Sequence, residues 1–226
     1  MTNFESTKEI TAVGSAVFFR NGLPSLSYGL FAKSAGLFGT DYIAASGLAR
    51  KAEQAANFVI FGIAQGYQPF AAYNYGARNK QRLTTALKYG CCIAGVIMTL
   101  GAITFLTIPD VLMGMFNAND EMLEIGCVAL RVICLCFIPA AIGIVFSSFY
   151  QATGHGLRSM TISMLRQLVF LVPAAYFLSN IGLNAVWFAF PIAEAGALIL
   201  AITFFINLYN KEIKYIDQPD KFSFKN

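Results

Sequence analysis

The stretch from Tyr89 to Pro109 contains no Asp, Glu, Lys or Arg, and it is bounded by Lys88 and Asp110. A helix needs about 20 predominantly apolar residues to cross the hydrocarbon core of a bilayer, and this stretch is that long. Within lipid every backbone polar group must be satisfied internally, which leaves the helix or the closed barrel as the spanning structure. We therefore predict a transmembrane helix here, and the rest of the chain has to fold around it.

Five further segments equal or approach this stretch in length and apolar character. The chain is 57% hydrophobic and only 12% charged, so it has too little polar surface for a soluble globule. We expect an all-α polytopic membrane protein with six transmembrane helices, the fourth kinked at Pro139. The expected helices run from about Ile10 to Leu37, from near Ile43 to Ala77, from Tyr89 to Pro109, from Met122 to Tyr150, from Met160 to Leu178 and from Leu183 to Leu208.

Basic residues indicate which side of the membrane each end faces. Lys and Arg collect in the connection after the second helix, in the connection after the fourth and in the tail, as is typical of cytoplasmic segments. We predict a six-helix lobe over residues 1–210, a charged tail over 211–226, and a multi-pass protein of the cell membrane with both termini cytoplasmic. Arg50 and Lys51 conflict with this rule, and we expect Glu53 to neutralise them in part.

Several function classes are disfavoured by composition. Sixteen Lys and Arg against twelve Asp and Glu give a net charge of +4, but the basic residues mark topology, and no nucleic-acid partner is expected. The five cysteines have no CxxC spacing, and His155 is the one histidine of the sequence. We therefore expect no metal, no cofactor and no enzymatic chemistry, and we interpret His155 as a solvated loop residue.

Glu194 is the sharpest candidate for a functional residue. It lies about midway along the last apolar segment, where an ionised carboxylate is costly and must be protonated, paired or exposed to water. One interpretation is a cation or proton site. The other is a structural ion pair with Arg131, Arg166 or Lys33.

Two amides and two basic residues are weaker candidates. Gln65 and Gln68 are three residues apart and share a helix face, so they either present amides to a cavity or hydrogen-bond to a neighbouring helix. Arg20 and Lys33 interrupt the first helix. They either contact an anionic partner, form ion pairs or extend toward the lipid headgroups.

Four motifs follow one another along the chain: QGYQPFAAYNYGARN at 65–79, IVFSSFYQATGHG at 144–156, MLRQLVFLVPAAYFLS at 164–179 and VWFAFPIAE at 186–194. With these motifs the sequence resembles the multidrug and toxic compound extrusion (MATE) family. Members of that family have twelve helices in two six-helix lobes. The resemblance covers essentially the whole chain but only helices seven to twelve of such a transporter.

The resemblance implies an antiporter that expels cationic, lipophilic compounds in exchange for sodium ions or protons, with the coupling ion left open between the two. Its partners would be those compounds, membrane lipids and an N-terminal six-helix lobe that this sequence does not contain. Gln65 and Gln68 match chamber-facing amides of the family. Glu194 matches the acid of a PIAE or PIAD pattern, and Arg20 matches a basic residue in an RQG-like passage, here RNG.

Two departures from the family limit what carries over. A GLPS sequence stands at Gly22 to Ser25, later than in the family, and no Asp or Glu occurs between Glu9 and Asp41, where one branch keeps a coupling acid. We expect the C-terminal half of an efflux antiporter, inactive without the other lobe. The alternatives are a non-transporting membrane interaction protein or vestigial fragment, and a flippase, which would need a more cationic chamber.

Overall fold

The computed structural model describes residue 22 and residues 25–31, 39–116 and 119–218. The first predicted helix, from about Ile10 to Leu37, lies mostly outside these described residues. The described part is helical and contains no strand. Its α-helices are α2 (Thr40–Gly76), α3 (Lys80–Thr107), α4 (Pro109–Gly114), α5 (Asp120–Ile133), α6 (Phe137–Ala152), α7 (Gly156–Met164), α8 (Val172–Ser179) and α9 (Ala189–Lys211). Shorter helical segments are η2 (Cys134–Cys136), η3 (Leu165–Leu171), η4 (Leu183–Phe188) and η5 (Ile213–Tyr215).

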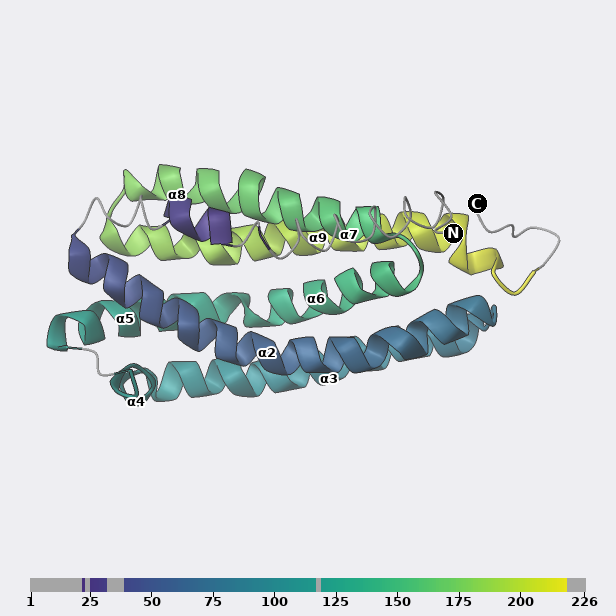
Figure 1. Ribbon diagram of the computed structural model, residues 1–226, viewed down its shortest axis with the longest axis horizontal. Helices are drawn as coiled ribbons and strands as arrows, with labels where there is room; N and C mark the ends of the chain where they lie inside the picture. The colour runs from purple at the N-terminus through teal and green to yellow at the C-terminus, as the bar shows by residue number, and fades with distance from the viewer. Residues whose placement is uncertain (1–21, 23–24, 32–38, 117–118, 219–226) are drawn as a thin grey trace, which may run out of the picture.

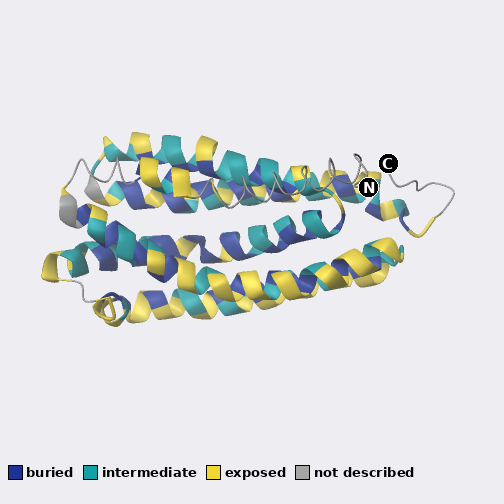
Figure 2. Cartoon of the chain, in the orientation of Figure 1, coloured by how far each residue is buried: buried dark blue, intermediate teal, exposed yellow. Residues whose placement is uncertain are grey.

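The long helices lie side by side in an elongated bundle, with α6 in the middle (Figure 1). Helix α6 packs against α2 and α3 on one side and against α7 and α9 on the other. Figure 2 shows the outer side of α3 exposed, whereas α6 is largely buried or half-buried. The lobe is thus organised around α6, and α3 presents an apolar face to its surroundings.

Four helical stretches of the described residues are long and apolar enough to cross a membrane, judged by length and composition. They are Lys80–Thr107, Asp120–Ala152, Gly156–Ser179 and Asn184–Tyr215. Helix α2 does not join them, although it is 37 residues long. The reason is its composition, because charged and amide side chains are spaced along it. The expected second helix is present, but one of its faces is polar.

Two of the expected helices are interrupted just before a proline. The fourth passes through the 3₁₀ turn η2, which ends three residues before Pro139. The fifth passes through η3, a π-helical segment that ends two residues before Pro173. A prolyl residue has no N–H to bond the preceding turn, so the helix there departs from α geometry. The kink predicted at Pro139 stays a prediction, although the 3₁₀ turn η2 lies just before this proline, and the π-helical segment η3 was not predicted.

Two connections differ from the sequence-based expectation. The predicted external loop from Asp110 to Asp120 contains the short helix α4, seen end-on in Figure 1. The expectation that His155 is solvated is wrong, because its Nε2 lies 3.1 Å from Oε2 of Glu212 and its side chain is 20% exposed. The contact could not be predicted from the sequence, because the two residues are 57 positions apart and meet only when the end of α9 lies beside the α6–α7 turn.

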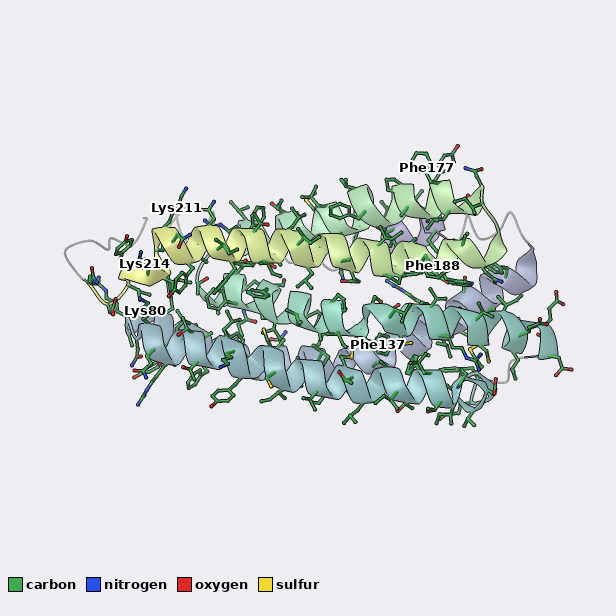
Figure 3. The ribbon with its side chains drawn as sticks, turned by 180° about the vertical axis from the view of Figure 1, so that it is seen from behind. Lys80, Phe137, Phe177, Phe188, Lys211 and Lys214 are labelled. Carbon is green, nitrogen blue, oxygen red and sulfur yellow. The ribbon has the colours of Figure 1, made fainter. Side chains whose placement is uncertain are left out.

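The end of the lobe near Lys80 is held together by contacts between distant segments. The Lys80 ammonium donates to the carbonyl oxygen of Lys214 at 3.0 Å, and Figure 3 shows these two residues near one another. Ile213 and Ile216 are fully buried. The segment that follows α9 therefore packs on the lobe at least as far as Ile216. The predicted division into a lobe and a tail at residue 210 stays a prediction.

We expect Ile216→Ala to destabilise the lobe, because removing buried methyl groups costs about 2–5 kcal/mol. The matched control is Asp217→Ala, which alters an exposed neighbour. The measurement is the apparent melting temperature of the purified chain in detergent, which should fall by several degrees in the first variant only. Equal melting temperatures would show that this segment does not stabilise the fold.

Candidate functional site

An ion pair lies inside two of the membrane-long stretches. Nη1 of Arg166 is 2.6 Å from Oε1 of Glu194, and the two side chains are 27% and 13% exposed. Arg166 belongs to η3 and Glu194 to α9, two segments that pack against each other. Among the partners left open for Glu194, Arg166 is therefore found and Arg131 is not, while Lys33 lies outside the described residues. Pairing lowers the cost of keeping both charges at this depth.

A second ion pair stands on α2. Nη1 of Arg50 is 3.0 Å from Oε2 of Glu53, and the amide nitrogen of Asn57 donates to Oε1 of the same carboxylate at 3.3 Å. The Arg50 guanidinium lies 5.5 Å from the centre of the Phe190 ring, a favourable cation–π distance. Arg50 thus faces the protein and does not mark topology. Of the two residues that conflict with the positive-inside rule, Arg50 is explained by this contact and Lys51 is not.

Both ion pairs line one cavity of about 360 Å³ between α2, α6, η3 and α9. One wall is a stripe on α2 that we call the α2 stripe, made of Gln54, Phe58, Phe61 and Gln65. Residues spaced by three and four fall on one side of a helix. Phe58 is 69% exposed and Phe61 is 42% exposed. Both side chains are therefore left largely uncovered by the described part of the chain.

The opposite wall carries hydroxyl and amide groups. Ser147 and Ser148 of α6 line the cavity together with Gln167 of η3. The hydroxyls of Ser147 and Ser159 are 2.5 Å apart, and Gln151 donates to Ser159 at 3.0 Å. This polar wall allows water or a polar ligand to enter a region that is otherwise apolar.

Two amide oxygens of the cavity have no partner. Gln167 is 4% exposed, and neither its Oε1 nor the Oδ1 of Asn57 receives a hydrogen bond from any residue that the structure describes. The great majority of buried polar atoms in native proteins are satisfied. Four other buried polar atoms of the described residues, on Ser27, Tyr67, Arg158 and Trp187, are also without a partner, so this feature is not specific to the cavity.

The predicted site residues are brought together only in part. Gln65 and Glu194 line the same cavity, whereas Gln68 is not among its lining residues, and Arg20 lies outside the described residues. Their functional roles stay predictions. Sequence reasoning missed Asn57 and Gln167 as site residues. The signal for Asn57 was its position four residues after Glu53, which puts the two on one helix face.

Metal-binding side chains do not converge within the described part of the chain, where no three His, Cys, Asp or Glu residues come close enough to hold an ion. The five cysteines, all among the described residues, form no disulfide bond. The acidic side chains that line the cavity are Glu53 and Glu194, and each is paired with an arginine.

Comparison with known proteins gives a consistent result. A model of the MatE family matches residues 16–177. The chain is 29% identical over 204 residues to the multidrug export protein MepA of Staphylococcus aureus (strain MSSA476), covering 88% of this chain and 44% of that protein. It is 26% identical over 208 residues to MepA of Staphylococcus haemolyticus (strain JCSC1435), covering 90% of this chain and 45% of that protein.

The fold agrees with that of a solved transporter. The Vibrio cholerae MATE transporter VcmN, in its bent form, superposes with a TM-score of 0.87 at 18% identity, covering 98% of this chain and 50% of that chain. This chain therefore spans about half the length of the proteins that it matches.

We expect Arg166→Gln to destabilise the lobe by about 3 kcal/mol, because it leaves the Glu194 carboxylate, which is only 13% exposed, without its partner. Glu194→Gln should cost a similar amount, and the double variant should cost less than the sum of the two. The measurement is a double-mutant cycle on denaturant unfolding in detergent. Additive losses would show that the two side chains do not interact.

Proposed function

Because the chain belongs to the MATE family, we propose that it is the C-terminal half of a cation-coupled multidrug efflux antiporter, inactive without an N-terminal six-helix lobe. The observation that carries this proposal is the cavity with one open wall. The α2 stripe lines the cavity, yet Phe58 is 69% exposed. A chamber that encloses a ligand needs a further surface that covers the exposed side chains of this stripe.

The location of the ion pairs supports transport by alternating access. In transporters built from two related halves, the ligand site lies near the middle of the membrane where the halves meet. Arg166 and Glu194 lie inside membrane-long stretches and line the cavity. A second lobe docked against the α2 stripe would place this charged region between the two halves.

The ion pair of Glu194 offers a way to couple ion binding to a change of conformation. Glu194 is paired with Arg166 when ionised, and binding a proton or a sodium ion there would weaken that pair. Loss of the pair would change the relative stability of two conformations that differ in how η3 packs on α9. An exchange mechanism requires such an ion-dependent shift between conformations. The ion that performs this exchange is a proton or sodium.

The cavity fits lipophilic cations better than anionic lipid-linked sugars. Its arginines, Arg50 and Arg166, are balanced by Glu53 and Glu194, so the charges of the lining cancel. The ring faces of Phe58 and Phe61 offer apolar contact and attract cations. A flippase for anionic lipids would need an excess of positive charge that this lining does not have.

Membrane topology follows from the distribution of basic residues. Lys80, Lys211 and Lys214 gather at one end of the lobe, while the labelled Phe177 and Phe188 lie toward the other (Figure 3). We assign the lysine end to the cytoplasm of a multi-pass protein of the cell membrane. We propose that both chain termini are cytoplasmic as well.

We expect the chain expressed alone in an efflux-deficient, drug-sensitive host to export no fluorescent lipophilic cation. Co-expression with the N-terminal half of Staphylococcus aureus MepA should produce export that depends on the ion gradient, because both walls of the chamber are then present. Glu194→Gln should return this export to the background level, while Glu124→Gln, an exposed acid away from the cavity, should not.

Gradient-dependent export by the chain alone would contradict the need for a second lobe. Full export by the Glu194→Gln variant, inserted at the same level as the unmodified chain, would leave Glu194 with a structural role only. Immunoblotting of isolated membranes supplies the insertion control.

A further inference from the structure

The two acids of the cavity are held in different ways. Glu194 of α9 is 2.6 Å from Arg166 of η3, so this pair joins two segments of the lobe. Glu53 is 3.0 Å from Arg50, which stands three residues earlier on the same helix. Ion pairs at this spacing add little to the stability of a helix. The pair on α2 can therefore open without separating two segments, whereas opening the other pair loosens the contact between η3 and α9.

Arg50 keeps favourable contacts when it leaves Glu53. Its guanidinium lies 5.5 Å from the centre of the Phe190 ring and 5.9 Å from the centre of the Tyr28 ring. Both rings also pack against Phe31, which is 1% exposed. An arginine is attracted to the faces of aromatic rings at such distances. These rings are thus a second binding place for the positive charge of Arg50, and the carboxylate can accept a different cation.

Glu53 remains held in place without Arg50. Nη1 of Arg50 contacts Oε2 of the carboxylate, whereas Nδ2 of Asn57 donates to Oε1 at 3.3 Å. The two donors use different oxygens, so the loss of one leaves the other bond intact. Both Arg50 and Glu53 line the cavity, with side chains that are 18% and 8% exposed. A cation in the cavity can therefore approach Oε2 from the side that the guanidinium occupies.

We propose that Glu53 is the acid that binds the lipophilic cation, and that Arg50 is an internal competitor, which the ligand displaces from Glu53. One positive charge replaces another in this exchange, so the carboxylate is not left buried without a partner, which would be costly. Glu194 keeps Arg166 and stays available to the coupling ion. This inference rests on the proposed function, because it names the residue of the same cavity that receives the ligand.

The test uses two probes that share one fluorescent aromatic body and differ in charge. The first is (anthracen-9-ylmethyl)trimethylammonium, a permanent cation, and the second is the neutral 9-anthracenemethanol. Binding to the full chain in phosphatidylcholine nanodiscs is measured by fluorescence anisotropy, with empty nanodiscs as the background. We expect the cation to bind about tenfold more tightly than the neutral probe, because the carboxylate attracts only the charged one.

Variants at the two positions should act in opposite directions, which a purely structural ion pair would not produce. Glu53→Gln should weaken binding of the cation about tenfold, because the acid is lost, and Arg50→Gln should strengthen it about tenfold, because the competitor is lost. Neither variant should change the affinity for the neutral probe. The matched control is Lys51→Gln, which removes the same charge from an exposed neighbour that does not line the cavity; it should change neither affinity.

An unchanged cation affinity in Arg50→Gln would overturn the competition, and an unchanged cation affinity in Glu53→Gln would overturn the assignment of Glu53. Where a single variant fails to fold, the double variant Arg50→Gln/Glu53→Gln decides the test, since it leaves neither charge of the pair unpaired. The double variant should bind both probes equally, and a retained preference for the cation would overturn the inference.

The export assay separates this inference from the proposed function. Equal binding of the two probes by an unmodified chain that exports in the co-expression assay would overturn the role of Glu53 and leave the proposed function intact. If the unmodified chain neither exports nor binds the cation, both are overturned.

Discussion

The ion pair between Arg166 and Glu194 is the interaction on which the rest of the lobe depends. Two opposite charges 2.6 Å apart stand inside helices that are otherwise apolar enough to cross a membrane. Either charge alone would be costly at that depth. Because they are paired, the helices η3 and α9 can border a polar cavity and still be compatible with insertion. The π-helical turn of η3 carries Arg166 beside Gln167, so the local irregularity coincides with the cavity wall.

Helix α2 has the complementary role. Its charged and amide side chains keep it from being as apolar as the other long helices, and five of them line the cavity: Arg50, Glu53, Gln54, Asn57 and Gln65. Arg50 and Glu53 pair with each other, while the α2 stripe forms a wall whose aromatic members remain exposed. An exposed wall of this kind is what a lobe presents when its chamber is completed by another surface. Half the length of the matching transporters is present in this chain, in agreement with that interpretation.

Much of the fold was predictable from the distribution of charge, because charge-free runs such as Tyr89 to Pro109 can only be buried in lipid or protein. The contacts between runs were not predictable. The partner of Glu194 was left open because sequence does not give the order of helices in a bundle. Gln65 lines the cavity and Gln68 does not, since the α2 stripe extends from Gln65 toward Gln54, and the functional roles of both stay predictions. The roles of Gln167 and His155 depend on segments that meet only in the folded lobe.

The proposed function requires that the α2 stripe borders an aqueous ligand chamber and not the lipid. The most direct measurement is the rate at which a small, charged thiol reagent labels Phe58→Cys in native membranes, in a chain without its own cysteines. Ile103→Cys, on the apolar face of α3 and 51% exposed in the lobe, is the reference. With the N-terminal half of Staphylococcus aureus MepA co-expressed, we expect rapid labelling of Phe58→Cys that a lipophilic cation slows, and little labelling of Ile103→Cys. Equal labelling of the two positions, with no effect of the cation, would contradict it.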